Sequence, residues 1–278
     1  MTEYAVNMYT AHPKHTTRVL LPLPSYGFDP SECGIPWKYL VTNGYKVVVA
    51  TPTGQVAQVD ERMYTGCDLG VLLRSTLMAD KYGADAYSEF KESHAFLNPI
   101  PYEAIDATKY DALLLPGGHD KGMREYLESN ILQQCVVDFF EKRKPVGAIC
   151  HGVVLVCRSI NKNTGKSVLW GRKTTSLTKV QELVAYNLTR CYLGDYYLTY
   201  PNATVEDEVK ATLQDPDMHF NRGPDMFIPL TRDSPHSLEC GFAAVNGNYV
   251  SARWPGDAHI FSVKFLAVIH AYIHSMEK

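Results

Sequence analysis

The sequence predicts a single α/β domain, residues 1–278, whose sheet is mostly parallel. Apolar runs of strand length are separated by segments with helical spacing, and each run is followed by a turn-forming segment. Apolar strands that alternate with helices are typical of parallel βαβ units, because helices cover both faces of such a sheet. Of the 278 residues, 45% are hydrophobic and 21% charged, so the chain can bury one substantial core.

Four strands and two helices are expected in the first half of the chain. The strands are apolar runs, each followed by a turn with proline or glycine, at residues 17–23, 45–51, 111–115 and 145–149. One helix is expected at 36–43, where Gly44 would end it. A second helix is expected at 130–142, where apolar residues recur at helical spacing.

Two segments interrupt this alternation. Residues 55–101 are polar and aromatic and too long for an ordinary strand-to-helix connection. We therefore expect a partly helical cap insertion over the carboxyl edge of the sheet. Residues 202–235 form a second insertion, after which the chain ends with a strand at 249–253, a loop, and an amphipathic helix at 258–276.

The composition argues against several classes of protein. A formal net charge of −3 gives no reason to expect nucleic acid or an anionic membrane as partner. No apolar run approaches the length of a transmembrane helix, and the first residues lack the pattern of a signal peptide. The seven cysteines are scattered without a CxxC pair, which is typical of reduced thiols, so we expect a cytoplasmic protein.

The segment after the fourth strand indicates a reactive cysteine. Cys150, His151 and Gly152 follow the strand, and a second apolar run begins at once, so strand, sharp turn and helix succeed one another. A nucleophile at such a turn faces the N-terminus of the next helix, which lowers a thiol pKa and can hold an oxyanion. Most buried cysteines are inert, and this arrangement is what distinguishes Cys150.

The turn after the third strand is expected to meet this cysteine. Ligands of an open parallel sheet bind outside the carboxyl ends of its strands, where Gly117 and Gly118 also lie. Their backbone N–H groups would face the thiol and complete an oxyanion hole with the N–H of His151.

Several ordered motifs resemble the ThiJ/PfpI superfamily of class I glutamine amidotransferase-like proteins, closest to its larger glyoxalase III and heat-shock chaperone members. They are AICHG at the elbow, LLLPGGHD before it, the Glu-x-x-x-Pro pattern that begins at Glu32, and VSARWPGD near the end. The stretch 171–176 resembles the family's strand after the elbow and leads to Glu182. The resemblance covers residues 18–269. It implies a flavodoxin-like, doubly wound sheet with helices on both faces, and a homodimer.

The resemblance also implies catalytic roles. Cys150 would be the nucleophile, with its thiolate favoured by the elbow and by His151, which would act as general base and acid. Glu182 would accept a hydrogen bond from His151 and fix its tautomer, and Glu32 would contact the thiol as a protonated acid or proton shuttle. Gly118 and His151 would donate backbone N–H groups. The structural alternatives are that His151 points away from the thiol and that Glu182 is a first-turn helix residue capped by Thr178.

Further residues are expected either to bind the substrate or to serve the structure. Gly117 and His119 lie next to the oxyanion turn, whereas Arg222, Arg253 and His259 would hold a carboxylate or would be packing and surface residues. We expect no cofactor and no metal. Glu92, His94 and His219 are the only residues that we considered for a metal site in the cap, and they stand singly, as surface residues do.

The resemblance implies an enzyme that acts on a small carbonyl compound. The preferred hypothesis is a glyoxalase III-like lyase that converts a 2-oxoaldehyde to a 2-hydroxy acid without glutathione. Two alternatives use the same thiol: a cysteine hydrolase of the amidase, peptidase or isonitrile-hydratase type, and a stress chaperone or redox sensor. A glutaminase is less expected, because His236 and Glu239 are spaced one residue too widely for a His-x-Glu pair.

Overall fold

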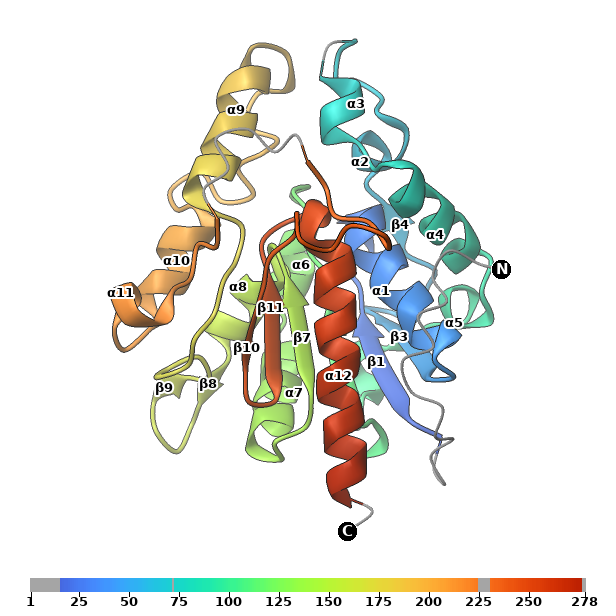
Figure 1. Ribbon diagram of the computed structural model, residues 1–278, viewed down its shortest axis with the longest axis vertical. Helices are drawn as coiled ribbons and strands as arrows, with labels where there is room; N and C mark the ends of the chain where they lie inside the picture. Colours follow the sequence, from blue (N-terminus) through green and yellow to red (C-terminus); the bar gives the residue numbers. More distant parts are fainter. Residues whose placement is uncertain (1–15, 72, 225–230, 277–278) are drawn as a thin grey trace.

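The expected α/β fold is confirmed in a computed structural model that describes residues 16–71, 73–224 and 231–276 (Figure 1). A seven-stranded sheet has the order β10-β11-β7-β6-β1-β3-β5, and all neighbours are parallel except β10 and β11. Its strands are β1 (Arg18–Pro22), β3 (Lys46–Thr51), β5 (Ile100–Pro101), β6 (Ala112–Leu115), β7 (Val146–Ile149), β10 (Ala243–Asn246) and β11 (Tyr249–Ala252). The four strands predicted in the first half are therefore β1, β3, β6 and β7.

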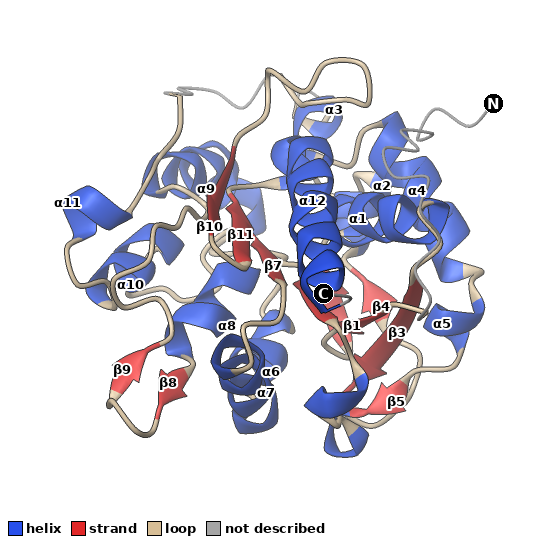
Figure 2. Cartoon of the chain, turned by 60° about the horizontal axis from the view of Figure 1, so that its bottom comes forward, coloured by secondary structure: helices blue, strands red, loops and turns tan. Residues whose placement is uncertain are grey.

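Helices cover both faces of this sheet, as a doubly wound fold requires (Figure 2). The helices α1 (Pro30–Thr42) and α12 (Ala258–Met276) lie on one face, and α7 (Asn130–Glu141) and α8 (Gly152–Arg158) lie on the other. The short α6 (Met123–Leu127) packs beside α8. The central strands β6 and β7 are buried along their whole length, because side chains on both of their faces meet helices.

The first helix begins earlier than its apolar pattern predicted. We expected a start at residue 36, but α1 begins at Pro30, because the Asp29 side chain accepts hydrogen bonds from the backbone N–H groups of Ser31 (2.8 Å) and Glu32 (3.0 Å). The N-terminal cap places Glu32 in the first turn, fully buried and directed toward the sheet edge where the turns converge.

The segment predicted as a cap, 55–101, is mostly helical, and its last residues form the edge strand β5. It contains β4 (Gln58–Val59), which pairs with β2 (Tyr26–Phe28), and the helices α2 (Glu61–Thr65), α3 (Arg74–Leu77), α4 (Lys81–Lys91) and α5 (His94–Leu97). Short 3-10 turns at Tyr102–Ala104 and Ala107–Lys109 lead on to β6, and a third spans Pro255–Asp257. In Figure 1, α3 and α9 (Lys179–Leu193) rise above the sheet on either side.

A small apolar cluster joins these two sides. Met63 and Leu69 come from the cap, Ala185 comes from α9, and Tyr196 and Tyr197 come from the loop after α9. These side chains, which are far apart in sequence, are buried against one another and hold the cap and α9 together above the carboxyl edge of the sheet.

The predicted strand after the elbow is absent at residues 171–176. The two-stranded hairpin β8 (Ile160–Asn161) and β9 (Lys166–Ser167) lies before that stretch, and Thr174 makes only an isolated bridge with Phe220. Residues 174–176 are buried, and their hydrogen bonds go to the Ser251 hydroxyl and to the backbones of His219 and Asn221 rather than to the backbone of a neighbouring strand.

The second predicted insertion, 202–235, contains α10 (Val205–Ala211) and α11 (Pro216–His219). Residues 225–230 of it lie outside the described part of the chain. Of the helices within the described ranges, none combines the length and apolar character that a membrane span needs.

Candidate active site

The turn between β7 and α8 has the geometry of a nucleophile elbow. Cys150 adopts a left-handed backbone conformation with φ 56°, which is rare for a residue other than glycine and is strained. Its backbone N–H donates to the carbonyl of Ala252 at 3.0 Å. A side chain at Gly152 would overlap the carbonyl oxygen of Leu115, so only glycine permits this close approach of helix and strand.

The side chain of His151 faces the thiol. Its Nδ1 lies 3.4 Å from Cys150 Sγ, and both residues are buried, at 0% and 1% exposure. The alternative in which this histidine points away from the cysteine is therefore wrong for this structure.

The other ring nitrogen of His151 has a partner that the sequence did not indicate. Its Nε2 lies 2.9 Å from the hydroxyl of Thr199, and that hydroxyl donates its proton to the carbonyl of His119 at 2.7 Å. Because the single hydroxyl proton is already used, Thr199 can only accept from His151. The hydrogen bonds thus assign the proton to Nε2 and leave Nδ1 as an acceptor toward the thiol.

Glu32 completes the arrangement from the opposite side. Its Oε2 accepts a hydrogen bond from the backbone N–H of Gly117 at 2.8 Å, and its Oε1 is buried without a hydrogen-bond partner among the described residues. Burial, and then the charge of Asp29, raise the pKa of Glu32 well above its ordinary value, while contact with Gly117 and Cys150 acts in the opposite direction. A protonated Glu32 can donate a hydrogen bond to the thiol.

Burial makes the resting pair neutral, which differs from the thiolate that we expected. The pKa of the Cys150 thiol is raised well above its ordinary value by burial and then by Glu32 and Asp29, although the His151 backbone N–H lowers it. Burial also holds the pKa of His151 well below its ordinary value. The resting state is therefore a thiol beside a neutral imidazole, and ionisation of the thiol requires transfer of its proton to Nδ1.

The turn at Gly117 and Gly118 approaches the elbow closely, but the N–H of Gly117, which we expected to face the thiol, donates to Glu32 instead. A side chain at Gly117 would come within 2.6 Å of the His151 backbone nitrogen and 3.0 Å of Cys150 Cβ, and one at Gly118 would overlap the carbonyl of Gly27. In the described part of the chain, the N–H groups of Gly118 and His151 donate no backbone hydrogen bond. Both remain able to donate to a developing oxyanion.

His119 joins the same group. Its ring centroid lies 5.1 Å from that of His151 and 4.8 Å from that of Tyr197. Burial lowers the pKa of His119 to about 4, so its imidazole is neutral at pH 7. Its ring lies beside the thiol–imidazole pair, and its role as a substrate contact stays a prediction.

Glu182 does not make the hydrogen bond that we predicted. Its Oε2 accepts from the backbone N–H of Val205 at 2.8 Å, at the start of α10, while Thr199 occupies the ring nitrogen of His151 that Glu182 was expected to hold. Glu182 lies in the first turn of α9, which Thr178 caps, so its structural alternative describes the observed contact.

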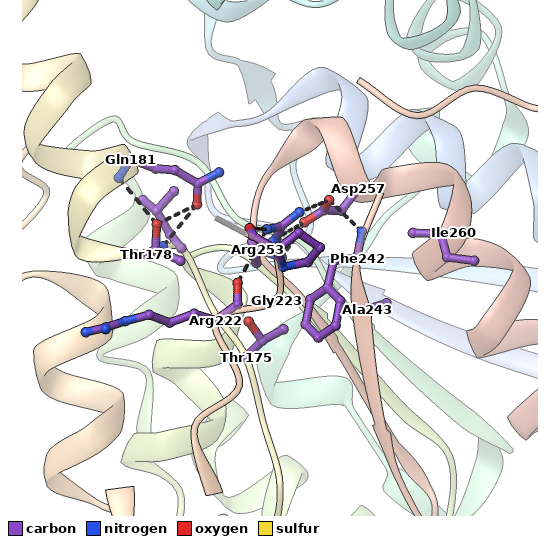
Figure 3. Close-up of polar contacts among 12 residues, drawn as sticks. Thr175, Thr178, Gln181, Arg222, Gly223, Phe242, Ala243, Arg253, Asp257 and Ile260 are labelled. Atoms are coloured by element: carbon purple, nitrogen blue, oxygen red, sulfur yellow. Dashed lines mark hydrogen bonds and ion pairs between the residues drawn. The ribbon is translucent and has the colours of Figure 1, made fainter. Parts of the chain in front are cut away.

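Three more candidates are engaged in structural contacts. The guanidinium of Arg222 binds Glu206, at 2.8 Å through Nε and 2.6 Å through Nη2, and Figure 3 shows its side chain directed away from Arg253. Arg253 forms a buried ion pair with Asp257 at 2.8 Å. His259 contacts the hydroxyl of Tyr39 through Nδ1 at 3.2 Å, in the packing of α1 against α12. These contacts account for all three without a substrate.

No group of three or more histidine, cysteine or carboxylate side chains with metal-binding geometry occurs within residues 16–71, 73–224 and 231–276. Of the residues considered for a metal, His219 accepts a hydrogen bond through Nδ1 from the backbone of Asp215 at 3.2 Å.

Comparison with known families agrees with the motifs. A family model described as ThiJ/PfpI family-like matches residues 23–224, well over half of the chain. A deglycase from Thermococcus kodakarensis is 25% identical over 170 residues, which cover 61% of this chain and 69% of that protein. Protein DJ-1 homolog D from Arabidopsis thaliana is 34% identical over 107 residues, 38% of this chain and 25% of that protein.

Another relative is an uncharacterised protein from Schizosaccharomyces pombe, 31% identical over 130 residues, which cover 45% of this chain and 46% of that protein. The matches to the fission yeast and Arabidopsis proteins thus span less than half of those relatives' lengths.

Solved structures share the fold at low identity. Glyoxalase III from Candida albicans has a TM-score of 0.65 and 18% identity, covering 91% of this chain and 98% of that one. DJ-1beta from Drosophila melanogaster has a TM-score of 0.51 and 15% identity, covering 94% of this chain and 98% of that one. At these identities the likeness describes the arrangement of the backbone.

Proposed function

Because this chain belongs to the ThiJ/PfpI family, we propose that it is a cysteine-dependent enzyme that acts on a small carbonyl compound, with Cys150 as nucleophile. The reaction that fits best is glyoxalase III-like: a 2-oxoaldehyde becomes a 2-hydroxy acid without glutathione. The observation that carries the proposal is the contact of Cys150 Sγ with His151 Nδ1 at 3.4 Å, on a strained turn. A neutral thiol beside a neutral base suits addition to an aldehyde, which needs a proton acceptor and then a proton donor.

In the first step the sulfur of Cys150 forms a bond to the aldehyde carbon. The carbonyl electron pair moves to the aldehyde oxygen, while the thiol proton passes to Nδ1 of His151. The N–H groups of Gly118 and His151 would stabilise the charge that develops on that oxygen. A proton from the imidazolium then gives a neutral hemithioacetal and returns His151 to the neutral form that the next step requires.

In the second step His151 removes the hydrogen from the former aldehyde carbon, which gives an enediol. Return of that proton to the neighbouring carbon, with transfer of a hydroxyl proton from the first oxygen to the second, gives the thioester of a 2-hydroxy acid, so one carbon is oxidised and its neighbour reduced without an external electron carrier. Water then attacks the thioester, which releases the acid and restores the thiol. Thr199 would hold the imidazole in the required tautomer throughout.

A second candidate reaction is deglycation, in which the same thiol takes a carbonyl adduct from an amine. The resemblance to the Thermococcus deglycase favours it. The first bond formed is again sulfur to carbonyl carbon, so both reactions require Cys150 and His151, and they differ in the group that leaves. The hydrolase and the chaperone or redox-sensor alternatives, the homodimer and the cytoplasmic location stay predictions.

The test is a side-by-side screen with 2-oxoaldehydes, glycated amines, amides and isonitriles. Wild-type protein is compared with Cys150→Ala and with Cys157→Ala, which removes another buried thiol, one whose Sγ donates to the Val154 carbonyl. We expect 2-oxoaldehyde turnover in wild type and Cys157→Ala and none in Cys150→Ala. Turnover of amides or isonitriles alone would show that the protein is a hydrolase and not an enzyme of carbonyl compounds. If none of the compounds is turned over, the enzyme assignment is contradicted.

A further inference from the structure

A small cavity adjoins the candidate site and shares His119 with it. Its volume is about 40 Å³, which is room for more than one water molecule or for a carboxylate-sized group. His119 forms one wall, and its ring lies 5.1 Å from the ring of His151. The polar side chains around the cavity are Thr76, His119, Gln181, Tyr197, Arg232 and Trp254.

Four of these side chains have a buried polar atom without a hydrogen-bond partner. They are Nδ1 of His119, Nε2 of Gln181, the hydroxyl of Tyr197 and Nε1 of Trp254. All four residues are at most 8% exposed. A buried polar group without a hydrogen-bond partner destabilises the folded state, so four around one cavity indicate a site that a ligand or water satisfies.

The free atoms are mainly donors. The indole N–H of Trp254 can only donate. The amide of Gln181 is oriented by its oxygen, which accepts from the backbone N–H and the hydroxyl of Thr178, so its NH₂ group is the free end. Figure 3 shows this oxygen facing Thr178 and the nitrogen pointing away from it. The hydroxyl of Tyr197 can donate as well, and such a set matches a ligand rich in acceptor oxygens.

Arg232 adds a positive charge to these donors. Its Nη2 is anchored by the carbonyl oxygens of Thr76 and Met78, at 3.3 and 2.9 Å, and its guanidinium lies 5.2 Å from the ring centre of Trp254. Within the described residues it forms no ion pair with a carboxylate. Its charge also lowers the pKa of the nearby carboxyls of Asp29 and Glu32, but the neutral carbonyls that hold the guanidinium leave it able to attract a further anion.

We infer that this cavity binds a carboxylate of the substrate, so that the preferred substrates are 2-oxoaldehydes that also carry a carboxylate group. The inference rests on the proposed function, because it places the aldehyde at Cys150 and the carboxylate in the neighbouring cavity. His119 lines the cavity and its ring lies 5.1 Å from that of His151, so the two places are neighbours, which suits a small substrate. Arg222, Arg253 and His259, the residues that we first considered for this task, are held in structural contacts instead.

The kinetic test compares methylglyoxal with 4,5-dioxopentanoate, a 2-oxoaldehyde that ends in a carboxylate. Wild type should prefer the second by about tenfold or more in kcat/KM, as expected for a charge-assisted pair. Arg232→Met and Tyr197→Phe should bring the ratio of the two kcat/KM values toward one. Arg190→Met removes an exposed arginine of α9 and should keep the wild-type ratio. Equal use of the two substrates by wild type would overturn the inference.

A binding measurement separates this inference from the proposed function. The probe is 4-oxopentanoate, titrated calorimetrically into Cys150→Ala, so that no turnover is needed. We expect binding that weakens about tenfold or more when Arg232→Met is added. Such binding supports the cavity even if no 2-oxoaldehyde is turned over. Turnover of methylglyoxal without binding of 4-oxopentanoate would leave the enzyme assignment standing and show that the cavity holds only water.

Discussion

The hydroxyl of Thr199 determines which ring nitrogen of His151 carries the proton. Because that hydroxyl donates to the carbonyl of His119, it can only accept from His151 Nε2, and Nδ1 is left to take the proton of Cys150. In many nucleophilic sites a carboxylate orients the histidine. Here a neutral hydroxyl does so, which avoids placing another negative charge near a thiol that burial already keeps protonated.

Thr199→Val replaces the hydroxyl with a methyl group of similar size and should lower kcat by about tenfold to a hundredfold, since His151 Nε2 loses its hydrogen bond to that hydroxyl. KM should change little. Thr199→Ser should retain most activity. Thr189→Val, which removes a buried hydroxyl bonded within α9, is the matched control for effects on packing. An unchanged kcat for Thr199→Val would show that this hydroxyl does not position the base.

Glu32 and Glu182 are both buried glutamates with a raised pKa, but only Glu32 lies beside the thiol. Glu32→Gln keeps an acceptor for the Gly117 N–H and loses the proton, so kcat should fall by about a hundredfold. Glu182→Gln should keep wild-type kcat, because its partner is the backbone of Val205. Steady-state kinetics of the two variants check this, and loss of activity in Glu182→Gln alone would reverse the assignment.

The sequence predicted the residues that lie within motifs and missed the one that does not. Cys150, His151 and Glu32 stand on an elbow and a capped helix, whose local patterns can be recognised. Thr199 lies in the loop after α9, where no periodicity or spacing marks it, and only the packing of that loop brings it to His151. The prediction for Glu182 was wrong because it relied on the position of this residue in the sequence, whereas the fold places its carboxyl group at the N–H of Val205.

At the scale of elements, Glu182 connects two helices. It stands in the first turn of α9, and its carboxyl group accepts from the first N–H of α10, so a side chain of one helix caps the start of the other. Burial raises its pKa to about 8. The contact is therefore with a protonated acid over most of the physiological range.

This pKa makes the free energy of unfolding depend on pH. Below the ordinary value of 4.5, folded and unfolded states both hold the proton; between 4.5 and about 8 the folded state holds a proton that the unfolded state has lost, so stability falls as pH rises. Glu182→Gln cannot lose a proton and should show a smaller fall between these values in urea unfolding. Glu103→Gln, at an exposed position, should follow the wild-type curve. An identical pH dependence in Glu182→Gln would contradict the assignment.

Strands and long helices were predicted well because a buried strand leaves a continuous apolar run in the sequence and a helix with one buried face leaves apolar residues at helical spacing. The stretch 171–176 failed because burial alone does not make a strand. Its backbone polar groups bond to the Ser251 side chain and to His219 and Asn221, the residues on either side of Phe220. They do not form the continuous row of hydrogen bonds that pairs two strands. The start of α1 was missed because a capping contact, not an apolar residue, extends it.

For the whole molecule, the fold brings five separate segments around one site. His119 follows β6, Cys150 follows β7, Trp254 follows β11, Gln181 stands on α9, and Arg232 comes from the second insertion. The parallel sheet explains the first three, because the carboxyl ends of its strands meet at one edge. The positions of Gln181 and Arg232 depend on how α9 and the second insertion pack above the sheet, and no sequence pattern predicted that packing.

The central claim is that Cys150 forms a covalent bond to the carbonyl carbon of the substrate. The most direct measurement is acid-quenched intact-mass and peptide analysis of the protein during a single turnover of a 2-oxoaldehyde. We predict an adduct of one substrate molecule on Cys150, which decays as the 2-hydroxy acid appears. With Cys150→Ala we predict neither adduct nor product. Formation of the acid at the wild-type rate by Cys150→Ala, or an adduct only on other residues, would contradict it.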